Sequence, residues 1–384
     1  MMRRAAILLL LVAAAARGQE LVEVDLPYRT AEGVEVEGRL CWRADLPPGK
    51  APAVLLIHGS NSGARLRKDL DGTIPGSETV DGRVARRFRD LARALAREGF
   101  VAYRTAKRGY ALDPERDRLE VVATITLERS VADGRRALAR LREQERVDPK
   151  RVVLFGHSEG TVVAPIVAQD DADVVGLILT GTVVDMDRVA RYQAVQRPVE
   201  AGFAAFDQDA DGKVTRAELD RGRLRGWTIP PWLGGRGVDR DQDGAVSRDE
   251  AEAQLLPAYR AFLAQARDPD DYWHGHLTVA KNLDLLPRLA RLPMIVVTGE
   301  LDWRTPTRDV RELERAMVRA GHPDHLFVYC PGLGHGFSPP LPPRPGESSP
   351  RETAGPPDPA VVNGIARLAA ERWARPRPAP IDAR

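Results

Sequence analysis

A serine stands between two glycines at the end of one apolar stretch of this chain. The stretch reads RVVLFGHSEGTVVAPIVA, in which Gly156-His157-Ser158-Glu159-Gly160 separates a strand-like run from a helix-like one. A G-x-S-x-G at such a junction places the serine on a tight turn at the carboxyl end of a parallel strand, where larger residues than glycine would clash. The free N–H groups of the helix start then lie beside the hydroxyl. Ser158 is therefore the predicted nucleophile.

A serine hydroxyl is a weak nucleophile near neutral pH, so it needs a base, and the base needs an acid to orient it. Asp302 comes just after the run PMIVVTG, and His335 comes just after the run HLFVYC. Both would project from the carboxyl ends of strands, the edge at which Ser158 sits. The predicted catalytic residues are thus Ser158, Asp302 and His335. Glu300 is the alternative acid, but it closes a strand, and we prefer Asp302 because it follows the turn.

Acyl transfer also needs N–H donors for the negatively charged oxygen of the intermediate. The run PAVLLIH ends at His58-Gly59, and Ser60 is the predicted donor there, with Asn61 close behind it. The second predicted donor is the N–H of Glu159, immediately after the nucleophile. Ser60 and Glu159 are therefore the predicted oxyanion hole, and His58 itself is expected to be structural.

The other histidines are expected to have ordinary structural roles. His157 is expected to pack locally at the turn. His274 and His276 are expected at the surface of a long connection, with a place in the substrate cleft as the alternative. His322 and His325 flank a helix-to-strand turn and are expected to be solvated.

Two further stretches, DQDADGKVTRAE and DRDQDGAVSRDE, have the spacing of calcium-binding loops. Calcium prefers hard oxygen ligands, and a twelve-residue loop supplies them at positions one, three, five, seven, nine and twelve, with glycine at six. The predicted ligands of the first loop are Asp207, Asp209, Asp211, the carbonyl of Lys213, Thr215 and Glu218. Those of the second loop are Asp239, Asp241, Asp243, the carbonyl of Ala245, Ser247 and Glu250.

The residues flanking the two loops differ in their capacity to form helices. Before the first loop a helix is possible, with Phe203 and Phe206 facing inward and Pro198 starting or kinking it. Before the second loop, IPPWLGGRGV cannot be a normal helix because it holds two prolines and three glycines. We interpret the stretch as a pair of EF-hand-type loops in which the helix that should precede the second loop is degraded. The two loops are expected to hold two structural calcium ions, which the chemistry does not need. Solvated acidic turns are the alternative.

Strand-like and helix-like runs alternate along most of the chain. The strand-like runs cover residues 21–29, 33–43, 52–58, 100–105, 151–156, 174–180, 293–299 and 325–330. The helical patterns cover residues 83–99, 128–144, 161–169, 307–321 and 359–374. The first two runs alternate in polarity and suit an antiparallel hairpin, whereas the later ones are continuously apolar, as in strands covered on both faces. The predicted class is α/β with a mainly parallel eight-stranded sheet flanked by helices.

The alternation stops after VVGLILTG and resumes at LPMIVVTG, so a cap is inserted into one α/β core. The predicted organisation is a signal peptide at 1–19, a first core part at 20–184, the cap with both calcium loops at 185–290, a second core part at 291–375 and a disordered tail at 376–384. The stretch MMRRAAILLLLVAAAARGQE has a basic start and an apolar run too short to span a bilayer comfortably. We therefore expect a secreted or periplasmic protein without a stable membrane anchor, an uncleaved anchor being the alternative.

The bulk composition narrows the class of protein further. The 384 residues are 43% hydrophobic and 29% charged, which is typical of a water-soluble globular protein. The formal net charge is +2 and no basic block stands out, so a nucleic-acid partner is not expected. Cys41 and Cys330 are expected to be two unpaired, buried thiols at opposite ends of the sheet.

These motifs together resemble a known family. The segments LLIHGSNSG, LARALAREGFVAYRTAKRGY, GHSEGTVVAPIVA, VTGELDWRTP and PGLGHGF are similar to those of secreted α/β-hydrolases related to dienelactone hydrolases and prolyl-oligopeptidase-type esterases. The resemblance covers roughly residues 50–185 and 290–375, and it implies the α/β-hydrolase fold, the chain order Ser, Asp, His, and hydrolysis of small carboxylic esters. The segment after HGSNSG is longer than usual, and Thr161 stands where relatives often carry glycine, so the substrate does not follow from the resemblance.

The predicted function is that of a secreted serine carboxylesterase, which cleaves a small-molecule ester through an acyl-enzyme on Ser158. One alternative is a calcium-binding protein on an inactive hydrolase scaffold. Another is a serine peptidase or acyltransferase with the same triad, because these activities share the acyl-enzyme step.

Overall fold

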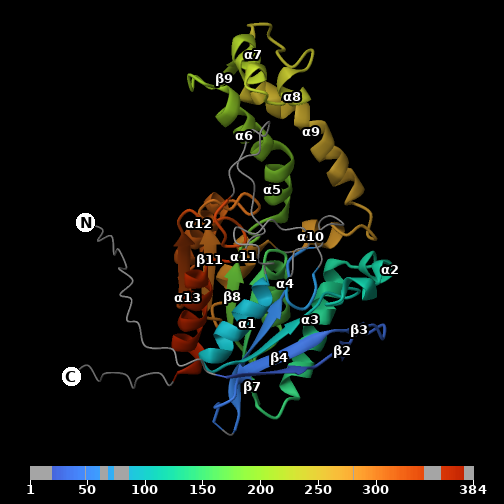
Figure 1. Cartoon of the computed structure of the whole chain (residues 1–384), viewed down its shortest axis with the longest axis vertical. Coiled ribbons are helices and arrows are strands. Elements are labelled where there is room, and N and C mark those ends of the chain that lie inside the picture. The colour runs from blue at the N-terminus through green and yellow to red at the C-terminus, as the bar shows by residue number, and fades with distance from the viewer. Residues whose placement is uncertain are drawn as a thin grey trace, which may run out of the picture.

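A mostly parallel β-sheet forms the centre of the molecule (Figure 1). The computed structural model describes residues 20–47, 49–60, 68–72, 86–279, 281–340 and 356–375. Within these residues the sheet has eight strands, in the spatial order β1 (Leu21–Asp25), β4 (Gly38–Arg43), β6 (Val101–Thr105), β5 (Ala51–Ile57), β7 (Val147–His157), β8 (Val174–Thr180), β11 (Met294–Gly299) and β12 (His325–Cys330). Strand β4 is antiparallel to both neighbours, β1 and β6, and the other pairs are parallel. The predicted fold class is confirmed.

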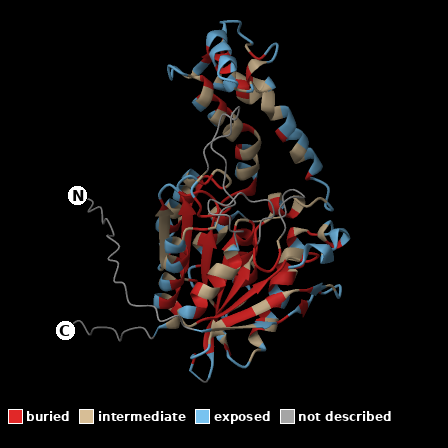
Figure 2. Cartoon of the chain, viewed as in Figure 1, coloured by how far each residue is buried: buried red, intermediate tan, exposed pale blue. Residues whose placement is uncertain are grey.

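Helices cover both faces of this sheet, which is why its strands are continuously apolar. One face is covered by α1 (Arg87–Arg97), α13 (Pro359–Ala369) and the short η4 (Ala370–Ala374). The other face is covered by α3 (Leu127–Arg142), α4 (Gly160–Gln169) and α12 (Thr307–Arg319). The inner strands β5, β6, β8 and β11 are buried along almost their whole length, whereas the edge strands β1 and β12 are partly exposed (Figure 2). The predicted helical patterns in the core are confirmed.

Smaller elements complete the core. Strand β2 (Tyr28–Arg29) pairs antiparallel with β3 (Glu35–Val36), and the chain also forms η1 (Pro114–Arg116) and α2 (Leu119–Val122). The antiparallel character predicted for the first two runs is confirmed by this pair and by the pairing of β1 with β4. Cys41 on β4 and Cys330 on β12 are both free and buried, as predicted, and five strands lie between theirs in the sheet.

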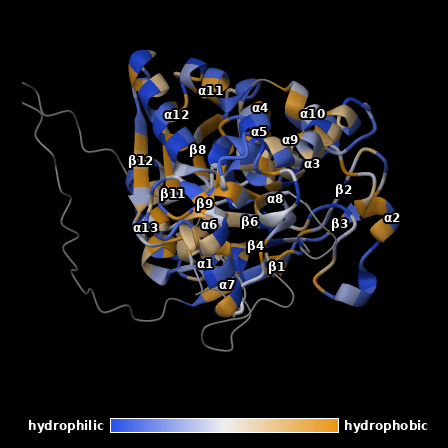
Figure 3. Cartoon of the chain, turned by 90° about the horizontal axis from the view of Figure 1, so that it is seen from above, coloured by the Kyte–Doolittle hydropathy of each residue, from blue (hydrophilic) through white to orange (hydrophobic). Residues whose placement is uncertain are grey.

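The chain between β8 and β11 leaves the core and forms a helical arm beyond the carboxyl ends of the strands (Figure 1). Its elements are α5 (Met186–Arg191), η2 (Tyr192–Gln196), α6 (Arg197–Phe206), β9 (Lys213–Thr215), α7 (Arg216–Leu224), α8 (Pro231–Gly234), β10 (Ala245–Ser247), α9 (Arg248–Gln265), α10 (His274–Thr278), α11 (Asn282–Leu285) and η3 (Leu286–Arg288). Where the arm meets the core, α10 contacts α5, and α9 contacts η2, which directly follows α5 (Figure 3).

The far end of the arm has a small hydrophobic core of its own. Phe203 and Phe206 of α6 are 1% and 0% exposed there, so the predicted inward orientation is confirmed. Pro198 lies in the first turn of α6, directly after the π-helical η2, as expected of a residue that cannot donate a backbone hydrogen bond. The entry to the second loop holds only the four-residue α8, because its prolines and glycines do not support a longer helix.

Several sequence-based expectations concern residues that the structure does not describe. The predicted signal peptide at 1–19, the predicted tail at 376–384 and Asn61 all lie outside the described ranges. Among the helices that are described, none has the length and apolar character needed to cross a membrane.

Candidate active site

Ser158 lies on a sharp turn between β7 and α4, as the motif predicts. Its φ angle is 57°, in the left-handed region that residues other than glycine rarely adopt. The glycines on either side are sterically required: a Cβ on Gly156 would lie 2.3 Å from Gly160 O, and one on Gly160 would lie 2.3 Å from Ile57 O. The close packing around Gly156 and Gly160 therefore fixes the turn, and the turn places the Ser158 hydroxyl at the carboxyl edge of the sheet.

Asp302 and His335 form a buried hydrogen-bonded pair at the same edge. Asp302 Oδ2 lies 2.8 Å from His335 Nδ1, and because an ionised carboxylate can only accept, we assign the proton to Nδ1. The other donors to Asp302 are Arg304 N at 2.8 Å, Thr305 N at 2.9 Å and Thr305 Oγ1 at 2.7 Å. Burial alone would raise the pKa of Asp302, but the imidazole of His335 and these hydrogen bonds bring the net pKa below its usual value. The pair is thus an ionised acid that orients an imidazole.

His335 lies beside the turn that carries Ser158. Ser158 N donates to Thr180 O at 2.9 Å, and a Cβ on the next residue, Gly181, would lie 2.6 Å from His335 Cε1. The ring of His157 is 4.8 Å from that of His335, centroid to centroid. Among the described residues no hydrogen bond joins the Ser158 hydroxyl to His335, and such bonds often tighten only when substrate binds.

Glu300, the alternative acid, does not take part in this arrangement. Its side chain is exposed, and its carboxylate lies 3.6 Å from Arg311. The structure therefore places Asp302, and not Glu300, against His335.

Ser60 and Glu159, the predicted oxyanion donors, lie beside the turn that carries Ser158. A Cβ on Gly59 would lie 2.8 Å from Ser158 Cβ, so the segment after β5 packs directly against the turn. Ser60, Ser158 and Glu159 line one cavity together. His58 is buried and stacks on Phe88 with 3.8 Å between ring centroids, which fits the structural role expected of it.

This cavity is mostly apolar and has a volume of about 420 Å³. Besides the three residues just named, its lining residues are Val183, Met186, Val189, Ala190, Gln193, Ala194, Phe262, Trp273, Arg304 and Thr305. Most of them belong to α5, η2, α9 and the segment before α10, so the arm supplies the walls and the core supplies the reactive groups.

Comparison with known proteins identifies the family. The model of the serine aminopeptidase, S33 family matches residues 82–338, which is more than half of the chain. The chain belongs to this family. The α/β-hydrolase fold implied by the motifs is therefore confirmed, and the matching family is that of the S33 serine aminopeptidases.

Individual relatives are more distant from this S33 chain. Esterase EstD of Thermotoga maritima is 31% identical over 123 residues, which span 32% of this chain and only 24% of that esterase. The α/β-hydrolase GrgF from Penicillium sp. sh18 has a TM-score of 0.45 at 20% identity, covering 82% of this chain and 91% of GrgF. A putative dienelactone hydrolase from Klebsiella pneumoniae has a TM-score of 0.42 at 12% identity, covering 83% and 88% of the two chains.

The solvent exposure predicted for His276 and His322 is wrong. His276 was expected at the surface but is 2% exposed, because α10 packs over the nucleophile turn and its Nε2 lies 2.7 Å from Glu159 Oε1. His322 was expected to be solvated but is 5% exposed, with Nε2 3.2 Å from Leu289 O. His274 and His325 are half-buried.

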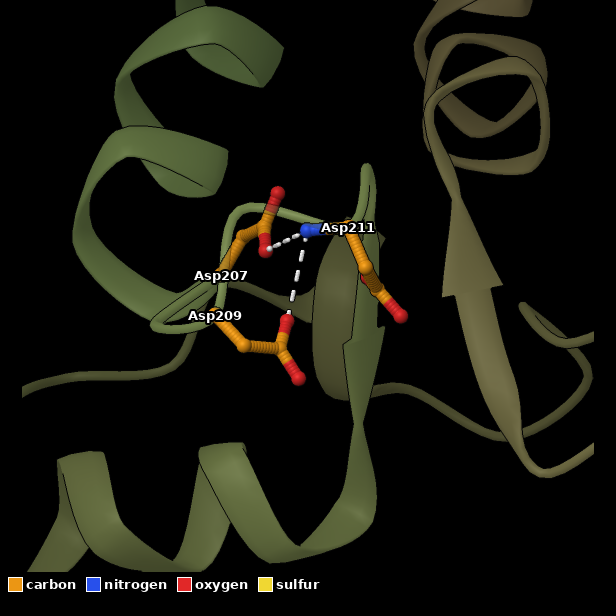
Figure 4. A group of neighbouring side chains, drawn as sticks. All are labelled: Asp207, Asp209 and Asp211. Atoms are coloured by element: carbon orange, nitrogen blue, oxygen red, sulfur yellow. Dashed lines mark hydrogen bonds between the residues drawn. The ribbon is translucent and has the colours of Figure 1, made fainter.

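The two acidic loops at the far end of the arm have matching conformations. Each has a left-handed residue at position four, Ala210 and Gln242, both with φ of 59°, and a left-handed glycine at position six. Strands β9 and β10, one from each loop, pair antiparallel. Asp207 and Asp209 both accept from Asp211 N, at 3.1 and 3.3 Å (Figure 4).

The side chains of these loops fit a hard cation. Ligand atoms of Asp207, Asp209 and Asp211 lie within 4.8 Å of one another, and so do those of Asp239, Asp241 and Asp243. Asp239 Oδ1 is buried with no hydrogen-bond partner, which is costly for a carboxylate unless another group, such as a cation, satisfies it. Calcium takes six to eight oxygen ligands of this kind. The donor set therefore fits the metal that the sequence pattern predicts.

Proposed function

We propose that this chain is a serine hydrolase that cleaves carboxylic esters. The observation that supports it most is the buried Asp302–His335 pair beside the left-handed Ser158, which lines an apolar cavity. Ser158 Oγ attacks the ester carbonyl carbon while its proton passes to His335 Nε2, and Asp302 stabilises the imidazolium that forms. The N–H groups of Ser60 and Glu159 bind the oxyanion.

The reaction then proceeds in two stages, acylation of Ser158 and hydrolysis of the acyl-enzyme. The C–O bond to the alcohol breaks, the alcohol leaves with the proton from His335, and the acyl group remains on Ser158. A water molecule, deprotonated by His335, attacks the acyl-enzyme and releases the acid, which restores the Ser158 hydroxyl.

The cavity walls indicate an apolar acyl group. Val183, Met186, Val189, Phe262 and Trp273 offer contact surface and no charge. Each CH₂ group transferred from water to such a surface gains about 0.8 kcal/mol, a factor of about four in affinity at 25 °C. The favoured substrates are thus esters with an apolar acyl chain short enough for the cavity.

A labelling and turnover experiment tests this proposal. A fluorophosphonate probe should label the protein at Ser158, as located by peptide mass mapping. With p-nitrophenyl esters of increasing acyl length, kcat/KM should rise about fourfold per CH₂ until the cavity is full and then fall. Absence of labelling would favour the alternative of an inactive, calcium-binding scaffold, and a flat chain-length response would contradict the acyl pocket.

The peptidase alternative rests on a separate observation, namely the description of the matching family as serine aminopeptidases. Aminoacyl p-nitroanilides therefore belong in the same assay. A kcat/KM for these amides above that for all the esters would favour the peptidase. A rate that rises with added alcohol and yields the transferred ester would favour an acyltransferase.

We further propose that the arm holds two structural calcium ions. Asp207, Asp209, Asp211, Lys213, Thr215 and Glu218 would hold one, and Asp239, Asp241, Asp243, Ala245, Ser247 and Glu250 the other. When bound, calcium neutralises the acidic loops and takes no part in proton transfer. The basic, apolar start of the chain supports a secreted or periplasmic location, where sub-millimolar affinity would suffice.

Removal of calcium should lower thermal stability. A site saturated at about 100 times its Kd contributes about 2.7 kcal/mol, and one kcal/mol corresponds to roughly 2–4 °C of Tm in domains of 150–250 residues. For each occupied site, we expect EDTA to lower Tm by about 5–10 °C in scanning fluorimetry. The pH profile of ester hydrolysis should stay the same, because β9 and α7, which hold part of the first acidic loop, lie at the far end of the arm from β11 and α12 of the core (Figure 1).

Two variants sharpen this experiment. Asp239→Asn should reduce the difference in Tm between calcium and EDTA, whereas Asp220→Asn, an exposed acid on α7 outside the loops, should leave it unchanged. The same Tm with and without EDTA in the unaltered protein would count against bound calcium.

A further inference from the structure

The side chain of Glu159 lies in a buried polar cluster that the ester chemistry above does not use. Tyr272 Oη donates to Glu159 Oε1 at 2.9 Å, and His276 Nε2 lies 2.7 Å from the same oxygen. Lys107 Nζ forms an ion pair with Oε2. Glu159 is 1% exposed. We call these four residues, Glu159, Lys107, Tyr272 and His276, the Glu159 cluster.

The Glu159 cluster joins three separate parts of the chain. Glu159 directly follows the nucleophile, and Lys107 follows β6 of the core. Tyr272 and His276 come from the arm, at sequence separations of 113 and 117 residues from Glu159. The arm therefore reaches the turn of Ser158 through one carboxylate.

The polar atoms of the Glu159 cluster are paired with one another. His276 Nδ1 lies 2.9 Å from Tyr272 O and Nε2 lies 2.7 Å from Glu159 Oε1, so each ring nitrogen faces an oxygen atom that can accept a hydrogen bond. Burial alone would raise the pKa of Glu159, but the Lys107 ammonium and the hydrogen bond from His276 hold it well below its usual range. The buried Glu159 anion thus lies between the Lys107 ammonium on one side and Tyr272 and His276 of the arm on the other, and removing one of these partners leaves the buried charge less well compensated.

The position of Glu159 gives this arrangement a catalytic consequence. The peptide between Ser158 and Glu159 carries the N–H that the proposed function assigns to the oxyanion hole. Ser158 is left-handed, and such strained residues persist only where their surroundings over-determine them. Holding both carboxylate oxygens of Glu159 restricts its side chain and, through it, the direction of that N–H.

We propose that Glu159 is a positioning residue whose contacts with His276 and Tyr272 make the oxyanion hole depend on the docked arm. This inference rests on the proposed serine-hydrolase function. It predicts that release of the carboxylate lowers the rate of the chemical step and leaves substrate binding in the apolar cavity nearly unchanged.

The test compares Glu159→Gln, His276→Gln and Tyr272→Phe in the full chain. The measured quantities are kcat and KM for a p-nitrophenyl ester, with kcat expressed per Ser158 site titrated by fluorophosphonate. Glu159→Gln turns an amide NH₂ or carbonyl toward Lys107 and removes the anion, and we expect kcat per site to fall about 100-fold. His276→Gln should lower it about tenfold and Tyr272→Phe by less, with KM within about twofold in each, as for groups that act in the transition state.

His274→Gln is the matched control. His274 lies on the same helix, but its Nδ1 lies 3.2 Å from Ala266 O and it is not part of the Glu159 cluster, so kcat per site should be unchanged. Counting titrated sites separates positioning from folding, because a merely structural role lowers the number of sites and the Tm but not kcat per site.

The outcomes are distinguishable. If the unaltered protein is not labelled at Ser158, the proposed function fails. If it is labelled and active while Glu159→Gln and His276→Gln keep their kcat per site, the positioning role of Glu159 is overturned. Should Glu159→Gln fail to fold, His276→Gln alone decides, since it leaves the Lys107 ion pair in place.

Discussion

Ser158→Ala should abolish fluorophosphonate labelling and lower ester turnover about 10⁶-fold. Without the hydroxyl no acyl-enzyme forms, and the remaining rate comes only from substrate binding and the oxyanion hole. The methyl group of alanine fits the space of the serine side chain, although the left-handed turn persists, so Tm should change little. The measurement is kcat/KM with a p-nitrophenyl ester, together with gel fluorescence after labelling.

Ser130→Ala is the matched control for this loss. Ser130 lies on α3, where its hydroxyl donates to Thr126 O at 2.9 Å, and it should keep full labelling and turnover. Labelling that persists in Ser158→Ala would show that another residue is the nucleophile, and the assignment of Ser158 would have to be abandoned.

Asp302→Asn should lower kcat about 10⁴-fold with the fold retained. An asparagine keeps the shape of the side chain but can offer an N–H to His335 Nδ1, which favours the wrong tautomer and removes the charge that stabilises the imidazolium. In the unaltered protein the carboxylate lies 2.8 Å from Nδ1 and is buried, so no solvent charge replaces it. Steady-state kinetics across pH 5 to 9 would measure the loss.

The lowered pKa of Asp302 adds a check on stability. Because the folded pKa is below the ordinary value of 3.8, the ionised carboxylate stabilises the fold above that pH and this contribution is lost as the pH falls through the lower, folded-state value. Asp302→Asn should therefore flatten the acid limb of the unfolding curve. Glu300→Gln, two residues away and exposed, should behave like the unaltered protein in both assays. An equal loss of activity in Glu300→Gln would contradict the pairing of Asp302 with His335.

The residues that could be predicted from sequence are those whose positions depend on local backbone. The turn at Ser158 is defined by Gly156 and Gly160, two residues to either side of it, and by the strand and helix that they join. Asp302 and His335 each follow an apolar strand, and parallel strands bring their carboxyl ends to one edge. The carboxylates at positions one, three and five of each acidic loop lie close together for the same reason, because each set falls within a single short loop.

The Glu159 cluster could not be predicted in this way. Whether His276 is solvated or buried depends on how α10 packs against a turn 117 residues earlier in the chain, and no local pattern encodes that contact. The same holds for His322, whose burial depends on the carbonyl of Leu289 on a separate segment. In both cases tertiary packing overrides the preference of a polar residue for solvent.

The attachment of the arm has an evolutionary consequence. The arm leaves the end of β8 and returns to β11, its immediate neighbour in the sheet, so its length does not alter the order of the strands. Mutations that reshape or replace the arm can change which acyl groups enter the cavity. The residues that transfer protons follow strands of the sheet and are not altered by such mutations. Selection for new substrates can therefore act on one contiguous gene segment without disturbing the inherited chemistry.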